Sequence, residues 1–180
     1  MDRSFYNACL NKEVFLDYQN PSLRARIWLK YFKPETNSVY LIRRFQFLIG
    51  GGGTVSRLMA RLIAIKLIRR YGIFVADECE IGIGLSIRHP AGIFITNAKI
   101  GDDFTIYQNC TIGRKTKDTP TGKGYVCIGN NVTMYANSMI IGDNTVTDCV
   151  TLGAGSCLLH GADKPGIYVG NPARRIKDYE

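Results

Sequence analysis

Histidine is the residue type in this chain best suited to proton transfer at neutral pH, and the chain has only two, His89 and His160. His89 lies in the stretch LSIRHPAG (85–92), among aliphatic and small residues and directly after Arg88. Imidazole exchanges its proton near pH 7, so such a side chain can serve as a base or an acid. The alternative is a core histidine whose ring bonds a backbone carbonyl. We expect His160 to be a surface residue.

The six cysteines predict neither a metal centre nor a disulfide framework. They form no CxxC pair and show no spacing typical of metal ligands. The first residues, MDRSFYNACLNKEVF, contain no basic stretch followed by an apolar run, and no segment reaches the roughly 18 apolar residues of a spanning helix. We therefore expect a cytoplasmic protein without a signal peptide, whose thiols are reduced. Cys79 and Cys110 are predicted to fill small buried positions.

Aliphatic residues recur at every sixth position over most of residues 75–158. The predicted inward residues are Val75, Ile81, Ile87, Ile93, Ile100, Ile106, Ile112, Ile128, Met134, Ile140, Val146, Leu152 and Leu158. A period of six is the signature of a parallel β-helix, in which three hexads close one triangular coil. No coil can bury its inner face alone, so neighbouring coils must stack. Residues 73–180 are therefore predicted to form a β-helix of roughly four coils, from which an insertion at 118–127 projects as a loop.

Residues 1–72 predict an N-terminal helical subdomain. Three segments have helical length and spacing, at 22–32, 35–49 and 54–71, and four glycines separate the last two. Ser22 and Thr54 are the predicted N-caps, and Gly72 is predicted to end the third helix.

Positive charge is concentrated in the helical half. Residues 1–72 contain 13 Lys and Arg against 4 Asp and Glu, whereas residues 73–180 contain 10 against 11. No nucleic-acid-binding motif accompanies this charge, so we expect no nucleic-acid partner, and an anionic metabolite, an acidic polymer or a membrane surface stays open. The third helix has five basic residues and no acid. It is interpreted first as a packed helix, with peripheral membrane contact as the alternative.

Four stretches carry a resemblance to a known family: GIGLSIRHPAGIFITNAKIG, IYQNCTIGRK, IGDNTVTDCVTLGAGS and GNPARRI. Over residues 72–177 the chain resembles the hexapeptide-repeat acyltransferases, specifically the serine acetyltransferase-like branch. The resemblance implies a mainly β protein with a left-handed parallel β-helix behind an N-terminal helical part. It also implies acetyl-CoA as the acyl donor, and a homotrimer or a dimer of trimers with each active site between two subunits. In that cleft the histidine matching His89 is the general base, which takes a proton from the acceptor hydroxyl that attacks the thioester.

The same resemblance implies where the donor binds, and it implies no metal. Small side chains at Gly113, Ala136 and Ala154 would let the pantetheine arm approach the backbone closely, although tight corners alone also require small residues. Cations would hold the phosphates, and they are available as a group at Arg114, Lys115, Lys117, Lys123, Arg174, Arg175 and Lys177. The projecting loop would help to wall the active site.

One departure from the serine-specific pattern concerns the group that orients the histidine. Phe74 stands where those enzymes place an aspartate in the preceding coil. Asp77, Glu78, Asp102 or a backbone carbonyl would have to take over that role, and the sequence does not choose among them.

Two further departures concern the acceptor. Arg88 replaces an aspartate that faces the amino acid substrate, and Tyr125 or Gly124 stands in place of a loop histidine that helps to bind serine. We therefore predict, with Arg88 and Tyr125 as acceptor-binding residues, an O-acetyltransferase acting on a sugar of a surface polysaccharide or its precursor. L-serine O-acetylation is the alternative, and a non-catalytic β-helix scaffold is a third class. Carbonic anhydrases built on the same repeat are set aside, because they need three histidines on zinc.

Overall fold

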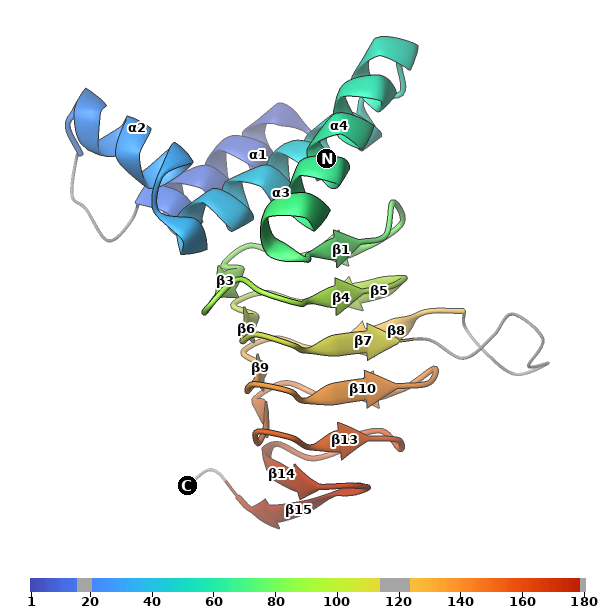
Figure 1. Ribbon diagram of the computed structural model, residues 1–180. Coiled ribbons are helices and arrows are strands. Elements are labelled where there is room, and N and C mark those ends of the chain that lie inside the picture. The colour runs from blue at the N-terminus through green and yellow to red at the C-terminus, as the bar shows by residue number, and fades with distance from the viewer. Residues whose placement is uncertain (16–20, 114–123, 179–180) are drawn as a thin grey trace.

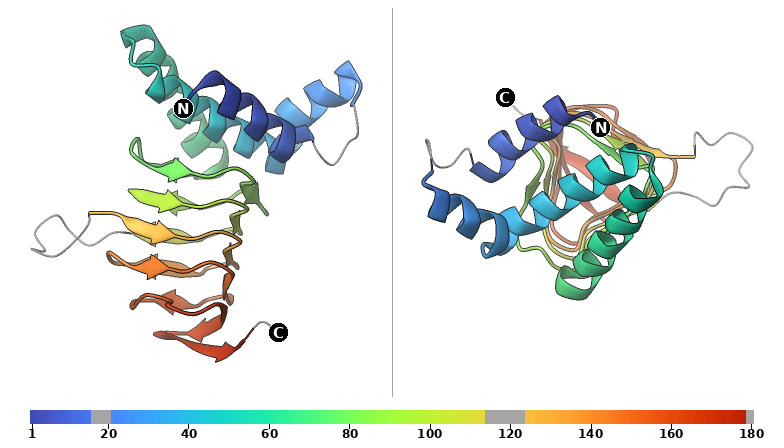
Figure 2. Two further views of the ribbon diagram at one scale, coloured as in Figure 1. Left: turned by 180° about the vertical axis from the view of Figure 1, so that it is seen from behind. Right: turned by 90° about the horizontal axis from the view of Figure 1, so that it is seen from above.

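Helices and strands occupy opposite ends of the molecule in the computed structural model (Figure 1). The structure describes residues 1–15, 21–113 and 124–178. The helices form a cap over one end of a three-sided prism of short strands, and the C-terminal strand lies at the other end (Figures 1 and 2). Among the helices described, none combines the length and the apolar character that crossing a membrane requires.

Three parallel sheets form the sides of the prism, and three strands advance the chain by about one coil. The sheets have the strand orders β1-β4-β7-β10-β13, β2-β5-β8-β11 and β3-β6-β9-β12-β14, and β15 pairs antiparallel with β14 at the edge of the third sheet. This topology confirms the predicted parallel β-helix. The strands are β1 (Phe74–Val75), β2 (Glu80–Ile81), β3 (Ser86–Ile87), β4 (Phe94–Ile95), β5 (Ala98–Ile100), β6 (Thr105–Ile106), β7 (Thr111–Gly113), β8 (Val126–Ile128), β9 (Thr133–Met134), β10 (Met139–Ile141), β11 (Thr145–Val146), β12 (Val150–Leu152), β13 (Cys157–Leu158), β14 (Gly166–Gly170) and β15 (Ala173–Lys177).

The inward side chains stack in register from coil to coil and form the core of the prism. On the first sheet the stacked residues are Val75, Ile95, Ile112, Ile140 and Leu158. The prediction of Ile93 for this position is wrong, because the register pairs Ile95 with Ile112. Ile93 lies two residues before the inward Ile95 and is itself fully buried. Cys110 lies two residues before the inward Ile112 and is also fully buried. Cys79 and Cys110 fill small buried positions, as predicted.

The insertion predicted at 118–127 falls mostly outside the described residues, which resume at Gly124. The prism itself resumes at Val126, where β8 begins. The Val126 side chain is fully buried and its Cα pairs with that of Ala98, so Val126 and Cys127 belong to the β-helix and not to a loop.

The cap consists of α1 (Arg3–Leu10), the π-helix η1 (Asn11–Phe15), α2 (Leu23–Tyr31), α3 (Pro34–Gly50) and α4 (Thr54–Tyr71). The three predicted helices are confirmed as α2, α3 and α4. The Ser22 hydroxyl accepts from the Ala25 backbone N–H at 3.3 Å, as an N-cap does, and Gly72 ends α4 with a left-handed φ of 62°. The prediction for Thr54 is wrong, because Gly53 is the N-cap and offers no side chain.

A buried ion pair joins the cap to the first coil. Arg43 on α3 and Glu13 on η1 have fully buried side chains, and two N–H···O bonds of 2.8 and 2.6 Å connect them. Arg43 also donates to the Ile81 carbonyl at 2.8 Å, and Glu13 accepts from the backbone N–H groups of Gly84 and Leu85 at 2.8 and 3.0 Å. Both charges therefore have several partners, which is the condition under which a buried ion pair is tolerated.

Candidate functional site

His89 lies in a corner of the prism that is two residues longer than the next corner on the same edge. Seven residues separate the inward Ile87 and Ile95, whereas five separate Ile106 and Ile112. Within this corner His89 has a φ of 55°, in the left-handed region that residues other than glycine, asparagine and aspartate seldom adopt. The imidazole is exposed, which excludes the alternative of a core histidine.

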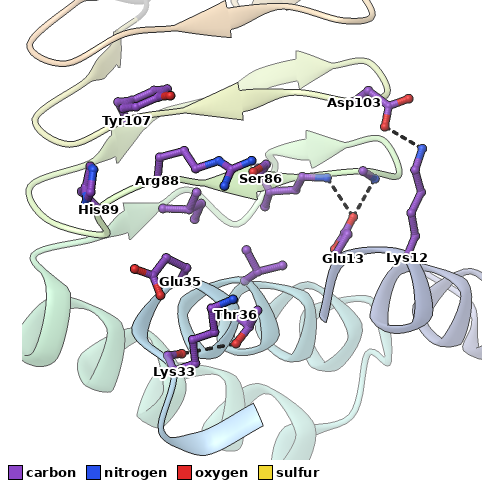
Figure 3. Close-up of a pocket in the computed structure, with 14 residues that line it drawn as sticks. Lys12, Glu13, Lys33, Glu35, Thr36, Ser86, Arg88, His89, Asp103 and Tyr107 are labelled. Atoms are coloured by element: carbon purple, nitrogen blue, oxygen red, sulfur yellow. Dashed lines mark hydrogen bonds and ion pairs between the residues drawn. The ribbon is translucent and has the colours of Figure 1, made fainter. Parts of the chain in front are cut away.

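A cavity of about 580 Å³ lies between this corner and the cap (Figure 3). Ser86, Arg88 and His89 reach it from β3 and the corner, and Lys33 and Glu35 reach it from the start of α3. Strand β3 and α3 are in contact. The structure therefore brings the predicted Arg88 and His89 together and adds charged residues that the sequence analysis did not identify, Lys33 and Glu35 among them.

Some of the charged side chains that line the cavity form ion pairs or hydrogen bonds, and others form none with the described residues. Glu13 is occupied by Arg43 and two backbone N–H groups, and Asp103 pairs with Lys12 at 2.6 Å. Within the described ranges, no hydrogen bond or ion pair engages the side-chain charges of Lys33, Glu35 or Arg88. The cavity thus presents one free carboxylate and two free cations beside an imidazole.

The His89 ring has no hydrogen-bond partner among the residues that the structure describes. Its aromatic neighbour is Tyr107, at 6.3 Å between ring centroids and tilted by 57°, and Tyr107 in turn lies 4.9 Å from Tyr135. These three side chains follow one edge of the prism from coil to coil. Both ring nitrogens of His89 are therefore free to exchange a proton with a ligand.

None of the three carboxylates considered as orienting groups is hydrogen-bonded to His89. Asp77 makes two bonds to Arg61 at 3.0 and 2.7 Å, and Glu78 accepts from Asn97. The Asp102 carboxylate accepts from a backbone N–H, that of Ile83, at 2.9 Å. Phe74 stacks on Phe94 with ring centroids 6.1 Å apart.

The residues predicted for the donor are spread over several parts of the prism. Ala136 and Ala154 lie in the corners that follow β9 and β12, on the same edge as His89, and the Ala136 carbonyl accepts from the N–H of Gly155 at 2.9 Å. Gly113 ends β7 on the neighbouring sheet, where an added Cβ would come within 3.2 Å of the Ile141 side chain. Arg174 and Lys177 are exposed on β15 at the far end of the prism. Arg114 and Lys115 lie outside the described residues, as do Lys117 and Lys123.

Tyr125 does not line the cavity of its own chain. It precedes β8 on another edge of the prism, where the Lys99 ammonium lies 5.1 Å from its ring centroid. Within one chain, the predicted site residues therefore do not all lie together. Arg88 and His89 line one cavity, and Tyr125 lies outside it.

The buried thiols of Cys9 and Cys79, and the metal-ligand types of the described ranges, offer no second reactive centre. Burial raises the pKa of the Cys79 thiol to about 12 and that of Cys9 to about 11, so neither is a thiolate at neutral pH. No group of three His, Cys, Asp or Glu side chains that could hold a metal ion occurs there.

Curated proteins similar to this chain include a serine acetyltransferase of Staphylococcus xylosus, which is 34% identical over 121 residues. The match covers 67% of this chain and 55% of the relative, so the chain spans about half the length of the curated relatives that it matches. The matched serine acetyltransferase of Staphylococcus aureus gives the same identity over 117 residues. No protein-family model matches the chain.

Solved structures share the whole fold. Soybean serine acetyltransferase complexed with serine superposes with a TM-score of 0.73 at 21% identity, covering 97% of this chain and 69% of that one. A serine acetyltransferase complexed with CoA gives a TM-score of 0.74 at 18% identity, covering 97% and 71%. These proteins have a left-handed parallel β-helix behind N-terminal helices, and the fold expected from the resemblance, including its hand, is thereby confirmed.

Proposed function

We propose that this protein is an acetyl-CoA-dependent O-acetyltransferase. His89 takes the proton of an acceptor hydroxyl while the hydroxyl oxygen attacks the thioester carbonyl. Collapse of the tetrahedral intermediate expels the CoA thiolate, which receives the proton from the imidazolium, so the products are an O-acetyl ester and CoA with a free thiol. The observation that carries the proposal is an exposed, unpartnered imidazole in a charged cavity of the fold that serine acetyltransferases share.

An L-serine-like acceptor replaces the sugar as the favoured one. The similar curated proteins are named serine acetyltransferases, and two similar structures contain serine. The cavity also offers a counter-charge for each end of an amino acid: Glu35 suits an ammonium group, and Arg88 or Lys33 suits a carboxylate. Arg88, which stands in place of an aspartate of the serine-specific pattern, is thus compatible with an amino acid acceptor when Glu35 lines the same cavity.

A sugar acceptor is the second candidate, and two observations favour it. Arg88 is the immediate neighbour of His89 and has no acidic partner in the described ranges, so its guanidinium can bind an acidic sugar. The volume of about 580 Å³ lies within the range of sites that hold ligands much larger than serine.

Acetyl-CoA as the donor rests on the similarity to a protein whose structure contains CoA. In this chain Ala136 and Ala154 lie on the edge that His89 begins, where their small side chains would let the pantetheine arm approach the backbone closely. Tyr107 and Tyr135 lie on the same edge nearer to the imidazole. Arg174, Lys177 and the other predicted cations would hold the phosphates. A cytoplasmic location, where acetyl-CoA is made and used, stays part of the proposal.

A trimeric assembly belongs to the same proposal. His89 is exposed on an edge of the prism, and Tyr125 and Gly113 lie outside its cavity. A neighbouring subunit would complete the site by bringing such residues to the His89 edge.

The test is release of the CoA thiol from acetyl-CoA by the purified full chain, with L-serine and a panel of neutral and acidic sugars as acceptors. We expect serine to be the most efficient acceptor. A higher kcat/KM with a sugar would select the second candidate, and no acceptor-dependent thiol release with any member of the panel would overturn the enzyme proposal.

A further inference from the structure

The outer face of α4 is apolar although nothing in the described chain covers it. Four side chains with the spacing 3, 4, 3 lie on one face of a helix. They are Val55, Leu58, Leu62 and Ile65, with exposed fractions of 72%, 62%, 59% and 46%, and we call them the α4 stripe. Isolated exposed apolar side chains are normal, but a contiguous set of four marks a surface that binds something.

The opposite face of α4 already has its packing partner. Ala60, Leu67 and Tyr71 are buried, and the Tyr71 hydroxyl donates to Asn37 on α3 at 2.7 Å. The stripe is therefore not needed to hold α4 in the cap. Figure 1 shows α4 rising away from the prism toward its N-terminal end, so the strands do not shield the most exposed members, Val55 and Leu58.

Basic residues continue the stripe and border it. Lys66 and Arg69 follow Leu62 and Ile65 by four residues each, which places them on the same side of the helix. Together with Arg57 they are exposed and have no ion pair in the described ranges, and α4 contains no acidic residue. The long side chains of Lys and Arg can extend from an apolar surface to a layer of negative charge above it.

A second helix of the cap has the same character. Helix α2 contains Arg24, Arg26 and Lys30 and no acid. Its exposed apolar side chains, together with that of the C-cap residue, are Leu23, Ile27, Trp28, Tyr31 and Phe32. Figure 1 shows the N-terminal end of α2, like that of α4, directed away from the prism.

We propose that the α4 stripe and its flanking basic residues dock onto the surface of a bilayer that contains anionic lipid. Apolar side chains would enter the boundary between headgroups and acyl chains, and the cations would contact the lipid phosphates. The helix lies in the plane of the surface and does not span it, consistent with the absence of a spanning helix among the described residues.

Charge favours a bilayer over a second copy of the chain as the occupant. Docking α4 against α4 of another copy would bring together Arg57, Lys66 and Arg69 of each helix, which have no ion pair in the described ranges, and α4 has no acid to place between them. The β-helical half offers no strongly acidic alternative, since its 10 basic residues nearly balance its 11 acidic ones. An anionic lipid surface supplies the opposite charge and an apolar layer at the same time.

The test is co-sedimentation of the full chain with vesicles of phosphatidylcholine alone and of phosphatidylcholine mixed with phosphatidylglycerol, each at low and high salt. We expect binding to the mixed vesicles at low salt, and a loss of about tenfold or more in the partition coefficient at high salt because the cations are screened. The double variant Leu58→Glu, Leu62→Glu should lose binding by a similar factor. Arg57→Gln combined with Lys66→Gln should weaken binding only where anionic lipid is present.

Ile176→Glu is the matched control, because Ile176 is 64% exposed at the other end of the molecule and should leave binding unchanged. Circular dichroism and light scattering on each variant without lipid check folding and mass. The proposal fails if the wild type does not bind the mixed vesicles at low salt, or if the double Leu variant still binds them. It also fails if that variant, while folded, has a smaller mass in solution than the wild type, because the stripe would then be a contact between copies.

Discussion

The position of His89 depends on a local lengthening of the chain. The corner after β3 contains two residues more than the next corner on the same edge, and in it the exposed His89 has a left-handed φ of 55° and lines the cavity below the cap. Left-handed φ values also occur at Asn109 and Asn137 in the shorter corners of the same edge, so this backbone conformation is a property of the corners and not of His89 alone. Glu35 and Arg88 give the same cavity one free charge of each sign, so the proposed base and the proposed acceptor-binding charges line one cavity.

Glu35→Gln should raise KM for serine by about tenfold or more, because a charge-assisted bond to the ammonium group is replaced by a weaker neutral one. The kcat at saturating serine and the KM for acetyl-CoA should change little. Steady-state thiol release measures all three. Glu80→Gln, an exposed acid on another sheet, is the control, and an unchanged KM for serine in Glu35→Gln would remove Glu35 from the acceptor site.

Burial of thiols predicts a loss of stability at alkaline pH. The pKa of Cys79 is raised from its ordinary 9.0 to about 12 and that of Cys9 to about 11. The unfolded chain then releases these protons at lower pH than the folded one, so the stability they contribute is complete below about pH 9 and is lost as the pH rises toward 11 or 12. Each thiol lowers the free energy of unfolding by at most about 1.4 kcal/mol per pH unit in that window.

Urea unfolding of Cys79→Ala across this pH range measures that effect. The variant should show a smaller decline above about pH 9 than the wild type. Cys149→Ala, whose thiol is exposed, should follow the wild type. If the free energy of unfolding falls equally with pH in Cys79→Ala and in the wild type, ionisation of the buried Cys79 thiol does not cause the alkaline loss of stability.

At the scale of elements, the site exists because α3 and η1 are fixed to the first coil. The Glu13–Arg43 pair is buried on both sides and bonds to the backbone at Ile81, Gly84 and Leu85. The cavity lies directly beside it, and Glu13 is one of its lining residues. A change in this contact would therefore move Glu35 relative to His89.

Glu13→Gln should destabilise the protein by about 3–5 kcal/mol, because it leaves the Arg43 guanidinium buried without a counter-charge. Asp77→Asn is the matched control: it breaks the exposed pair with Arg61, which should cost at most about 1 kcal/mol. Equilibrium unfolding in urea compares the two. Equal small losses would mean that the buried pair does not hold the cap to the prism.

The sequence predicted the elements better than their contacts. The repeat of six is carried by the residues themselves, so the β-helix could be predicted, but Ile93 and Ile95 are both buried aliphatic residues and only the register distinguishes them. Helix α1 escaped prediction because it has only eight residues, so that Tyr6, Cys9 and Leu10, which pack toward the core, span little more than one turn. Glu35 could not be found, because its approach to His89 depends on how the cap docks, a contact between residues more than 50 positions apart.

At the scale of the whole molecule, the two ends of the chain carry different surfaces. The prism presents a column of side chains along one edge, and the cap closes the first coil and carries the basic, apolar α4. The match to the serine acetyltransferase of Staphylococcus xylosus covers 67% of this chain, whereas the similar solved structures cover 97% of it and therefore share the cap as well as the prism.

Light scattering of the purified chain should give the mass of a trimer or of a dimer of trimers, since the His89 edge is open in one chain and Tyr125 lies outside the cavity. The Leu58→Glu, Leu62→Glu variant should have the same mass. A monomer at micromolar concentration, with acetyltransferase activity intact, would mean that one chain holds a complete site.

The central claim is that His89 is the base of an acetyl transfer, and thiol release from acetyl-CoA with L-serine tests it directly when His89→Ala is compared with the wild type. We predict a fall in kcat of about 10²–10⁴-fold, the usual contribution of a general base, with little change in KM for acetyl-CoA. His160→Ala, at the exposed histidine far down the prism, should behave as the wild type. Near-full activity of a folded His89→Ala protein would contradict the account.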